Sequence, residues 1–424
     1  MSVVRFTARG AEPAGDRLGP ILESLRARAS ALGAVKVDQL LDFFDAFGSK
    51  ILSDERTRNL EGLMFLSAWL QRRNLSKLLE LNLGGKVACL DGFQPDGRGY
   101  LAARPQGLVA MWMAGNVATL PMFSLVPALL AKNVCLVKLA AEEPEGMDRL
   151  LAVLAETETA GLRGTDLLET MAVVWFDYRN RALNEAMSLA ADAKIVWGGA
   201  EAIAAISALP RHEHCVEVVF GPKYSIGVID RRRLEGDRSA LEAAVAGFVR
   251  DVAVFDQRAC SAPQTIFIEH SDEVSLADVG RLFADQLSRL PPKPGLDAYT
   301  TMRILNVRAE HALDDRRDVI ASADGANWTV CLDRQATMKE AVQSRTIFLS
   351  EIGSWREILP LLSPKIQTVG CAFADGADAL AFAEAATAAG VVRCVRPGIM
   401  NVYESPWDGK LLVNQLVRWV VLKP

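Results

Sequence analysis

Residues 108–139 read LVAMWMAGNVATLPMFSLVPALLAKNVCLVKL, and this stretch decides the fold. No charged residue occurs from position 105 to position 131, so the segment is long enough on its face to cross a membrane. Its interior is interrupted by Gly115, Asn116 and two prolines, which are typical of loops and helix starts. We therefore predict a strand, a loop, a helix and a second strand, because a strand covered on both faces is apolar throughout.

The same alternation of strands and helices continues to residue 230. Helical patterns separate most of the apolar runs, and each run is short enough to be one strand. This alternation predicts a parallel sheet covered by helices, an architecture that binds nucleotides at the carboxyl ends of its strands. The predicted strands after LVAMWM are VCLVKL, MAVVWF, AKIVWG, VEVVF and YSIGVID.

The chain is expected to contain two α/β domains and a C-terminal extension. Residues 1–100 are mostly helical in pattern and are expected to be the N-terminal part of the first domain, which continues over residues 101–230. A second α/β domain is expected over residues 231–395. Residues 396–424 end in the apolar run LLVNQLVRWVVL, which is either an oligomer contact or a strand that returns to the core.

The composition is that of a globular protein. The chain has 424 residues, of which 50% are hydrophobic and 23% are charged. Its net charge of -5 provides no overall basic field for nucleic acid or an anionic membrane. The N-terminus carries Arg5, Arg9 and Glu12 with no apolar core behind them, so we expect no signal peptide.

The cysteines and histidines do not form a recognisable metal or disulfide pattern. Seven cysteines are scattered along the chain without a CxxC pair, which argues against a disulfide framework and favours a reducing cytoplasm. RHEHC at 211–215 places two histidines beside Cys215, but a third ligand is not evident. We therefore predict no metal site.

Three motifs follow predicted strands of the first domain. Asn116 could direct its amide beyond the end of LVAMWM, or it could simply cap the next helix. Lys138 ends VCLVKL and could reach a ribose or a phosphate, or it could be a solvated strand end. Gly198 and Gly199 precede a helix whose first N–H groups are suited to a phosphate, although their spacing does not match GxGxxG.

Cys260 lies in the stretch DQRACSAPQ, residues 256–264. Taken alone, this cysteine is more readily interpreted as a packing residue than as a nucleophile, because free cysteines are among the most buried residues. No histidine lies near it in sequence to activate the thiol. The role of Cys260 therefore depends on the rest of the chain.

Together these motifs resemble the aldehyde dehydrogenase superfamily, and most closely its acyl-CoA reductase branch, the LuxC-type long-chain fatty acyl-CoA reductases of bacterial luminescence. The resemblance covers most of the chain from about Leu101 onward, and several motifs occur in the family's order. It implies an aldehyde-dehydrogenase-like fold with two parallel-sheet, Rossmann-like domains, the first binding NAD(P) and the second catalytic. The matching pieces are GNVATLPMFSLVPALLAKNVCLVKL, IVWGGAEAI, FGPKYSIGVID, DQRACSAPQ, KIQTVG and GVVRCVRPGIMNVYESPWDG.

The resemblance also implies a role for each candidate residue. Cys260 corresponds to the acyl-accepting nucleophile, and Asn116 to the donor that stabilises the oxyanion. The interval between Asn116 and Lys138 is close to that of the superfamily, in which the lysine binds the adenosine ribose. Gly198 and Gly199 correspond to the turn that binds the pyrophosphate.

Two departures from the superfamily pattern bear on the reaction. Hydrolytic members carry a glutamate in ELGGKS that activates water, and Val219 stands at that place here. Without this base the acyl-enzyme is expected to keep its thioester until a thiol or a hydride removes the acyl group. Glu217, two residues earlier, is the alternative base, because it shares a strand face with Val219.

The cofactor positions depart from the pattern as well. NAD-preferring members often carry an acidic residue three places after the lysine, where this chain has Ala141, so we expect NADPH; Glu142 keeps NADH as the alternative. Ile203 replaces the second glycine of the phosphate turn. Thr346 replaces the glutamate of EIFGP that holds the nicotinamide ribose, which implies a looser grip there.

The expected function is NADPH-dependent reduction of an acyl thioester to the aldehyde through an acyl-enzyme on Cys260. The donor would be an acyl-CoA or an acylated carrier or synthetase protein. One alternative is a hydrolytic NAD(P)-dependent aldehyde dehydrogenase, against which Val219 argues. Another is a non-catalytic scaffold subunit of an acyl-activating complex. The superfamily resemblance also implies a homo-oligomer.

Overall fold

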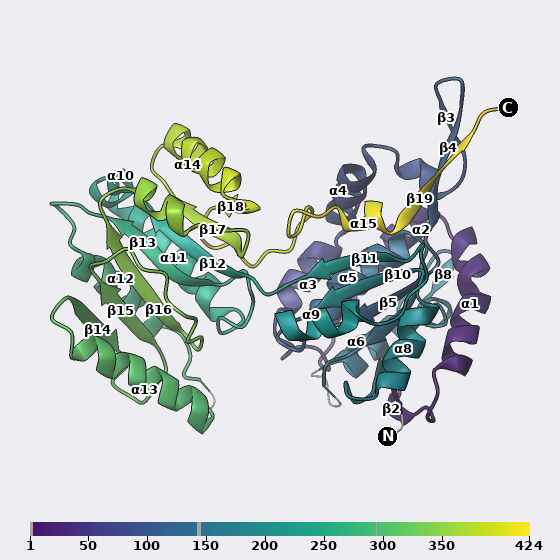
Figure 1. Ribbon diagram of the computed structural model, residues 1–424, viewed down its shortest axis with the longest axis horizontal. Coiled ribbons are helices and arrows are strands. Elements are labelled where there is room, and N and C mark those ends of the chain that lie inside the picture. The colour runs from purple at the N-terminus through teal and green to yellow at the C-terminus, as the bar shows by residue number, and fades with distance from the viewer. Residues whose placement is uncertain (1–2, 142–145, 294) are drawn as a thin grey trace. The chain divides into compact units, whose positions relative to one another are not determined.

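The computed structural model describes residues 3–141, 146–293 and 295–424, which form two compact units. Unit 1 contains residues 1–221 and 403–424, and unit 2 contains residues 222–402. Each unit has its own seven-stranded sheet with helices packed against it (Figure 1). The predicted α/β class with two sheet domains is confirmed.

The sheet of unit 1 has the strand order β11-β10-β5-β6-β9-β1-β2. The five strands from β11 to β9 are parallel, and β1 joins the edge antiparallel to β9. Every residue of β5, β6 and β10 is buried, which explains why these strands are apolar along their length. The strands are β1 (Val4–Thr7), β2 (Gly10–Pro13), β5 (Leu108–Trp112), β6 (Val134–Lys138), β9 (Met171–Trp175), β10 (Ala193–Trp197) and β11 (Val216–Phe220).

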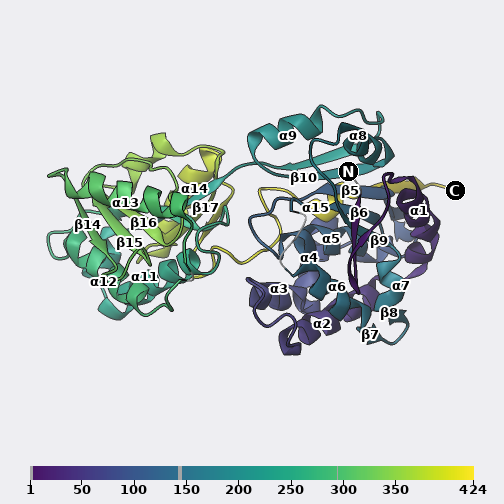
Figure 2. The same ribbon diagram turned by 90° about the horizontal axis from the view of Figure 1, so that it is seen from below.

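Helices cover both faces of this sheet because the crossover connections change direction. The chain moves one way across the sheet from β5 through β6 to β9, and the other way from β9 through β10 to β11. Right-handed crossovers therefore place α5 and α6 on one face and α8 and α9 on the other (Figure 2). The direction reverses between β5 and β10, and parallel sheets bind ligands beyond the carboxyl ends of strands at such a point. These connections contain α5 (Leu120–Leu130), α6 (Met147–Ala155), α7 (Gly164–Leu168), α8 (Arg181–Ala190), α9 (Ala200–Ser207) and the hairpin β7 (Glu158–Thr159) and β8 (Leu162–Arg163).

The uncharged stretch that resembles a membrane span is β5, a loop and α5, as predicted from its interruptions. Nowhere in the described residues is a helix both long and apolar enough to cross a membrane.

The first hundred residues belong to unit 1, and their helical pattern is confirmed in part. The structure adds β1 and β2, which the helical interpretation missed because they are four-residue strands at the sheet edge. Helix α1 lies on the α8 side, where Arg26 donates to the Asp192 carboxylate at 3.2 Å and to the Ala190 carbonyl at 2.6 Å. The remaining elements are α1 (Gly19–Ala34), α2 (Val37–Ser53), α3 (Leu63–Leu70), α4 (Arg72–Leu83), η1 (Val87–Leu90), β3 (Gln94–Asp96) and β4 (Gly99–Pro105).

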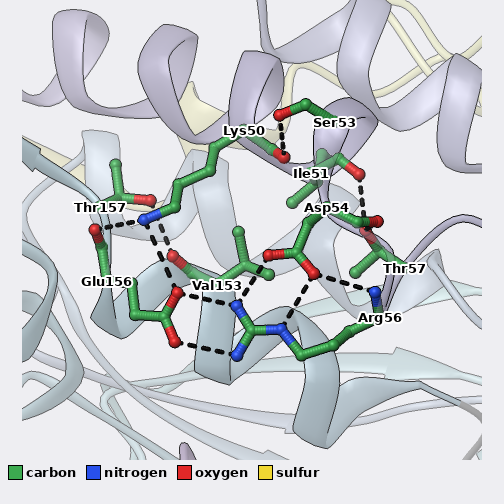
Figure 3. A network of polar contacts seen from close by, with 9 residues as sticks. All are labelled: Lys50, Ile51, Ser53, Asp54, Arg56, Thr57, Val153, Glu156 and Thr157. Carbon is green, nitrogen blue, oxygen red and sulfur yellow. Dashed lines mark hydrogen bonds and ion pairs between the residues drawn. The ribbon is translucent and has the colours of Figure 1, made fainter.

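A network of ion pairs joins the end of α2 to the end of α6 (Figure 3). Arg56 donates to both carboxylate oxygens of Glu156, at 2.9 and 2.7 Å, and also to Asp54. Lys50 adds a bond to the backbone carbonyl of Glu156 at 2.5 Å. The hydrogen bond from Arg56 lowers the pKa of Asp54 to about 2. The network therefore links the end of α2 to the end of α6, one of the helices that cover the sheet.

Arg56→Ala should lower the Tm at pH 7 by about 1–3 °C, because exposed charge networks contribute little to stability. The folded pKa of Asp54 lies below its unfolded value, so its contribution is present above about pH 4 and is lost as the pH falls through about 2. The Tm difference between the two proteins should shrink over that interval. Thermal unfolding from pH 7 to pH 2 measures it, and Arg58→Ala, which breaks an exposed pair with Glu55, is the matched control. A Tm difference between wild type and Arg56→Ala that stays constant down to pH 2 would contradict a stabilising bond between Arg56 and the ionised Asp54.

Unit 2 is built on a second sheet, with the order β14-β15-β16-β13-β12-β17-β18. Its strands are parallel except β14, which pairs antiparallel with β15 at the edge. One core packs α11 and α12 against the sheet, and another packs η2 and α14 against it. The elements are β12 (Tyr224–Ile229), α10 (Arg231–Glu235), α11 (Arg238–Ala253), β13 (Pro263–Glu269), α12 (Leu276–Ser288), α13 (Ala298–Ala312), β14 (Arg317–Ala321), β15 (Thr329–Asp333), β16 (Thr346–Ile352), η2 (Trp355–Leu361), β17 (Ile366–Ala372), α14 (Gly376–Ala388) and β18 (Arg393–Val395).

The expected boundaries between the segments need correction at two places. The run YSIGVID was assigned to the first domain, but β12 pairs with β13 and β17, so unit 2 begins at Pro222. The extension that we expected over residues 396–424 is divided, because residues 396–402 stay in unit 2 and the rest returns to unit 1. In unit 1 the strand β19 (Val417–Leu422) follows α15 (Leu412–Gln415) and pairs antiparallel with β4. The last apolar run therefore contains a strand that returns to unit 1, as one of the two interpretations predicted. The other interpretation, an oligomer contact, stays a proposal.

Candidate active site

The structure brings Asn116, Lys138 and the two glycines together at the carboxyl ends of three adjacent strands of the unit 1 sheet. Strands β10, β5 and β6 are neighbours, and Val196, Trp112 and Lys138 lie side by side in their register. Gly198 and Gly199 follow β10, the loop with Asn116 follows β5, and Lys138 is the last residue of β6. This edge is also where the crossover direction reverses, which is the expected place for a nucleotide.

Lys138 is a buried cation at this edge, and the solvated-strand-end interpretation is therefore wrong. Its side chain is 6% exposed, and Nζ lies 5.0 Å from the centre of the Phe176 ring. Nζ donates a long hydrogen bond of 3.4 Å to the Leu139 carbonyl. Burial lowers the pKa of Lys138 to about 8, with Asp177 acting in the opposite direction. A lysine that is desolvated at a ligand edge is suited to an anionic or hydroxyl-rich group.

The glycine pair leaves room at the start of α9. Gly199 is the N-cap of this helix, and a Cβ built there would lie more than 4 Å from every atom outside its immediate neighbours in the described chain. At Gly198 a Cβ would lie 3.2 Å from the Cβ of Ala202, so a side chain is tolerated less well. Ile203 packs toward Gly221, with Cδ1 3.6 Å from the Cβ position of that glycine. The helix start is thus open to an anion, although Ile203 adds bulk one turn in.

Asn116 does not cap α5. The N-cap residue of that helix is Thr119, and Asn116 lies half-buried in the loop that precedes it. Asn116 is therefore not the N-cap residue of this helix, and its side chain belongs to the loop beyond the carboxyl end of β5.

Cys260 belongs to unit 2, where it lies half-buried in the loop between α11 and β13. It differs from Cys331, which is buried in β15 and whose pKa burial raises to about 12. Other half-buried cysteines exist, including Cys215 and Cys371, so exposure alone does not single out Cys260. What distinguishes it is the construction of its loop.

The loop DQRACSAPQ has a fixed and strained backbone. Asp256 and Gln257 both adopt the left-handed conformation, with φ of 48° and 61°. The buried Gln257 side chain donates to the carbonyls of Pro263 and Thr346 at 3.0 Å each, and accepts from the Thr346 N–H at 2.9 Å. Non-glycine residues in this conformation cost on the order of 1–3 kcal/mol each and cluster at functional sites. Sequence patterns did not identify Gln257 as the residue that fixes the loop.

The two positions that bear on hydrolysis lie on β11. Glu217 pairs with Arg211 at 2.7 Å and lies opposite Lys194 in the register of β10 and β11. Val219 follows on the same strand face. Glu217, the alternative base, is therefore already paired with Arg211 within unit 1.

The histidines of RHEHC lie in an exposed loop before β11, where His214 contacts Glu213 at 3.2 Å. Within residues 3–141, 146–293 and 295–424 there is no group of three or more potential metal ligands. Glu142, which bears on the cofactor preference, lies outside the described residues.

Comparison with known proteins identifies the family. The family model described as acyl-CoA reductase (LuxC) matches residues 34–419. The long-chain acyl-protein thioester reductase of Aliivibrio fischeri is 23% identical over 418 residues, covering 91% of this chain and 82% of that protein. Among solved structures, an aldehyde dehydrogenase from Brucella melitensis biovar abortus 2308 superposes with a TM-score of 0.70 at 12% identity, covering 99% of this chain and 93% of that one. An E. coli NADP-dependent enzyme superposes with a TM-score of 0.69 at 12% identity, with 99% and 94% covered.

At these identities the structural likeness establishes the fold, whereas the family model establishes descent. The predicted aldehyde-dehydrogenase-like fold is confirmed. The match from residue 34 to residue 419 shows that the chain belongs to the acyl-CoA reductase (LuxC) family.

Proposed function

We propose that this protein reduces an acyl thioester to an aldehyde, with Cys260 as the nucleophile. The observation that carries the proposal is that the family's nucleophile position holds an incompletely buried thiol in a loop with a fixed backbone. Thiolates suit this chemistry because they are strong nucleophiles and good leaving groups.

The chemistry assigns one role to each side chain. The Cys260 thiolate attacks the carbonyl carbon of the thioester, so that a new C–S bond forms and the bond to the donor sulfur breaks. The donor thiolate leaves and takes up a proton. Asn116 donates from its amide to the oxyanion that forms during attack, helped by a backbone N–H at the cysteine. A reduced nicotinamide, when bound, would supply the hydride. As the C–H bond forms at the acyl carbon, the C–S bond to Cys260 breaks, so that the aldehyde leaves and the Cys260 thiolate is restored.

The residues at the edge of the unit 1 sheet fit a dinucleotide. Lys138 would hold the adenosine ribose, and the open helix start at Gly198 and Gly199 would hold the pyrophosphate. Ala141, which is exposed, presents no carboxylate to repel a 2′-phosphate, so we propose NADPH as the preferred donor and NADH as the alternative. The comparison of kcat/KM for the two cofactors tests this preference directly.

Lys138→Met should weaken cofactor binding and stabilise the fold. Loss of a charged hydrogen-bond donor should raise the KM for NADPH by about 10- to 100-fold. The folded pKa of Lys138 lies near 8, below its unfolded value, so the buried ammonium costs stability below that pH and the cost fades as the pH rises toward 10.5. Removing it should raise the free energy of unfolding at pH 7 by on the order of 1 kcal/mol.

Lys194→Met is the matched control for this prediction. Lys194 is fully buried near the start of β10, and burial lowers its pKa as well. Its replacement should stabilise the fold in the same way but leave the KM for NADPH unchanged, because it lies away from the carboxyl edge. Equal KM changes in the two variants would remove Lys138 from the cofactor site.

The acyl donor is an acyl-CoA or an acylated protein. The curated relative from Aliivibrio fischeri is named a long-chain acyl-protein thioester reductase, and this name supports a long acyl chain here. We further propose a cytoplasmic location, since no cysteine of the described residues forms a disulfide, and a homo-oligomer.

The stoichiometry of one turnover tests the proposal. NADPH oxidised, thiol released and aldehyde formed should be equal when a long-chain acyl-CoA is the donor. Free aldehyde with NADP⁺ and no thiol should give no acid, because Val219 replaces the water-activating glutamate and Glu217 is paired with Arg211. Rapid acid formation without a thiol acceptor would instead favour the hydrolytic alternative.

A further inference from the structure

Two side chains from distant segments hold the peptide that follows Cys260. The Ser225 hydroxyl donates to the backbone carbonyl of Cys260 at 2.7 Å. The hydroxyl of the next residue, Ser261, donates to Oδ1 of Asn401 at 2.7 Å. Ser225 and Ser261 are at most 3% exposed and Asn401 is 5% exposed, so both bonds are shielded from water. All of these residues belong to unit 2.

Ser225 is built into the sheet in an unusual way. Its hydroxyl accepts from the Thr368 N–H at 3.2 Å, so a side chain takes the place of a backbone ladder partner between β12 and β17. The register of β12 shifts at this point against both β13 and β17. Because the hydroxyl accepts from Thr368 and has one proton to give, its donation to the Cys260 carbonyl is directionally fixed. A register shift of this kind re-aims a side chain, here toward the cysteine loop.

Asn401 and the segment around it are also held by hydrogen bonds. Its Nδ2 donates to the backbone carbonyl of Asp251 at 2.7 Å. The buried Asp251 carboxylate accepts from the N–H groups of Gly398 and Met400 at 2.6 and 3.1 Å. Arg393 donates to the carbonyls of Met400, Ile399 and Val402 at 2.7, 3.1 and 3.0 Å. The segment that carries Asn401 is therefore fixed from both sides.

We propose that Ser225 and Asn401 are positioning residues that fix the Cys260–Ser261 peptide and so aim the thiol at the acyl carbonyl. The inference rests on the proposed function of Cys260. Buried networks whose members are all bonded are rigid, and a nucleophile displaced by about 1 Å can lose on the order of 100-fold in rate. Neither residue touches the substrate in this scheme, so their effect should fall on kcat and not on cofactor binding.

Ser225→Ala and Asn401→Ala should each lower kcat by about 10- to 100-fold, with an unchanged KM for NADPH. Both should also change the rate at which iodoacetamide alkylates Cys260, a readout that general loss of stability does not move at a temperature well below Tm. Ser350→Ala is the matched control, since its hydroxyl is buried in β16 of the same unit and has no hydrogen-bond partner in the described part of the chain. That variant should keep the wild-type kcat.

Ser261→Ala tests the contact between Asn401 and the cysteine loop, because it removes the Ser261–Asn401 bond without changing a residue of the sheet. If Asn401 acts through Ser261, the Ser261→Ala/Asn401→Ala double variant should be no slower than the slower single variant. Both substitutions remove the same Ser261–Asn401 bond, and Asn401→Ala also removes the bond to the Asp251 carbonyl. Folded Ser225→Ala and Asn401→Ala proteins with the kcat and alkylation rate of Ser350→Ala would overturn the proposal. Independent, multiplicative losses in Ser261→Ala and Asn401→Ala would overturn the Asn401 arm. Wild-type activity in Cys260→Ala would instead refute the proposed function itself.

Discussion

Replacing Cys260 with alanine should abolish reduction of acyl thioesters while the protein stays folded. Loss of a covalent nucleophile lowers kcat by at least about 10⁴-fold in enzymes of this kind. The Ser225 hydroxyl donates to the backbone carbonyl of this residue, a bond that alanine retains, and the thiol itself is only half-buried. The free energy of unfolding should therefore change by less than about 1 kcal/mol. Aldehyde production and thermal unfolding, measured on the same preparation, test both statements.

Cys331→Ala is the control variant, because Cys331 is a cysteine that packs in the core. Cys331 is fully buried in β15, so its replacement should lower stability by about 1 kcal/mol or more without a change in kcat of the folded protein. If Cys260→Ala behaved like Cys331→Ala, the packing interpretation of Cys260 would hold and the scaffold alternative would gain support.

Asn116→Ala should lower kcat by about 10²- to 10³-fold, because one preorganised oxyanion donor contributes roughly 3–4 kcal/mol to the transition state. The KM for the acyl donor should change little, since the oxyanion exists only after attack. Steady-state kinetics with a fixed long-chain acyl-CoA separates the two parameters.

Asn180→Ala is the matched control, because Asn180 is the N-cap residue of a helix and Asn116 is not. Asn180 is the N-cap of α8, where its side chain accepts from the Leu183 N–H at 3.2 Å. Its loss should cost about 1 kcal/mol of stability and leave kcat unchanged. An Asn116→Ala protein that lost stability but kept its kcat would show that the asparagine only shapes its loop.

The first α/β unit was predictable because its signals are local. The run from β5 to β6 contains continuous apolar strands, breaks at Gly115 and Pro121, and a lysine at a strand end, all of which can be recognised without knowledge of distant contacts. The adjacency of β10, β5 and β6 then follows from the handedness of the crossovers. Burial of Lys138 was harder to foresee, because the Phe176 ring that covers it comes from after β9.

Sheet membership was not predictable in the same way. Tyr224–Ile229 is an apolar strand that fits either sheet, and only its pairing with β13 and β17 assigns it to unit 2. Helix α13 is difficult to predict from the sequence, because its buried residues are Ile304 and His311 and much of its remaining surface is exposed. An apolar pattern that weak is difficult to distinguish from a loop.

The cysteine loop shows most clearly where sequence patterns fail. Family resemblance points to Cys260, but the residues that hold its peptide are Ser225 and Asn401, which lie far from it in the chain. A serine in a strand and an asparagine after a glycine-containing turn carry no local sign of such a role. Contacts between distant segments must be seen in the fold before these residues can be singled out.

Acylation of the protein without cofactor tests the central claim most directly. The protein is incubated with a long-chain acyl-CoA in the absence of NADPH, quenched in acid and digested, and the peptide that contains Cys260 is weighed by mass spectrometry. The account predicts one acyl mass on that peptide, CoA released in equal amount, and no adduct in Cys260→Ala. Absence of the acyl mass across several chain lengths and with an acylated protein donor, or its presence on another residue, would contradict the account.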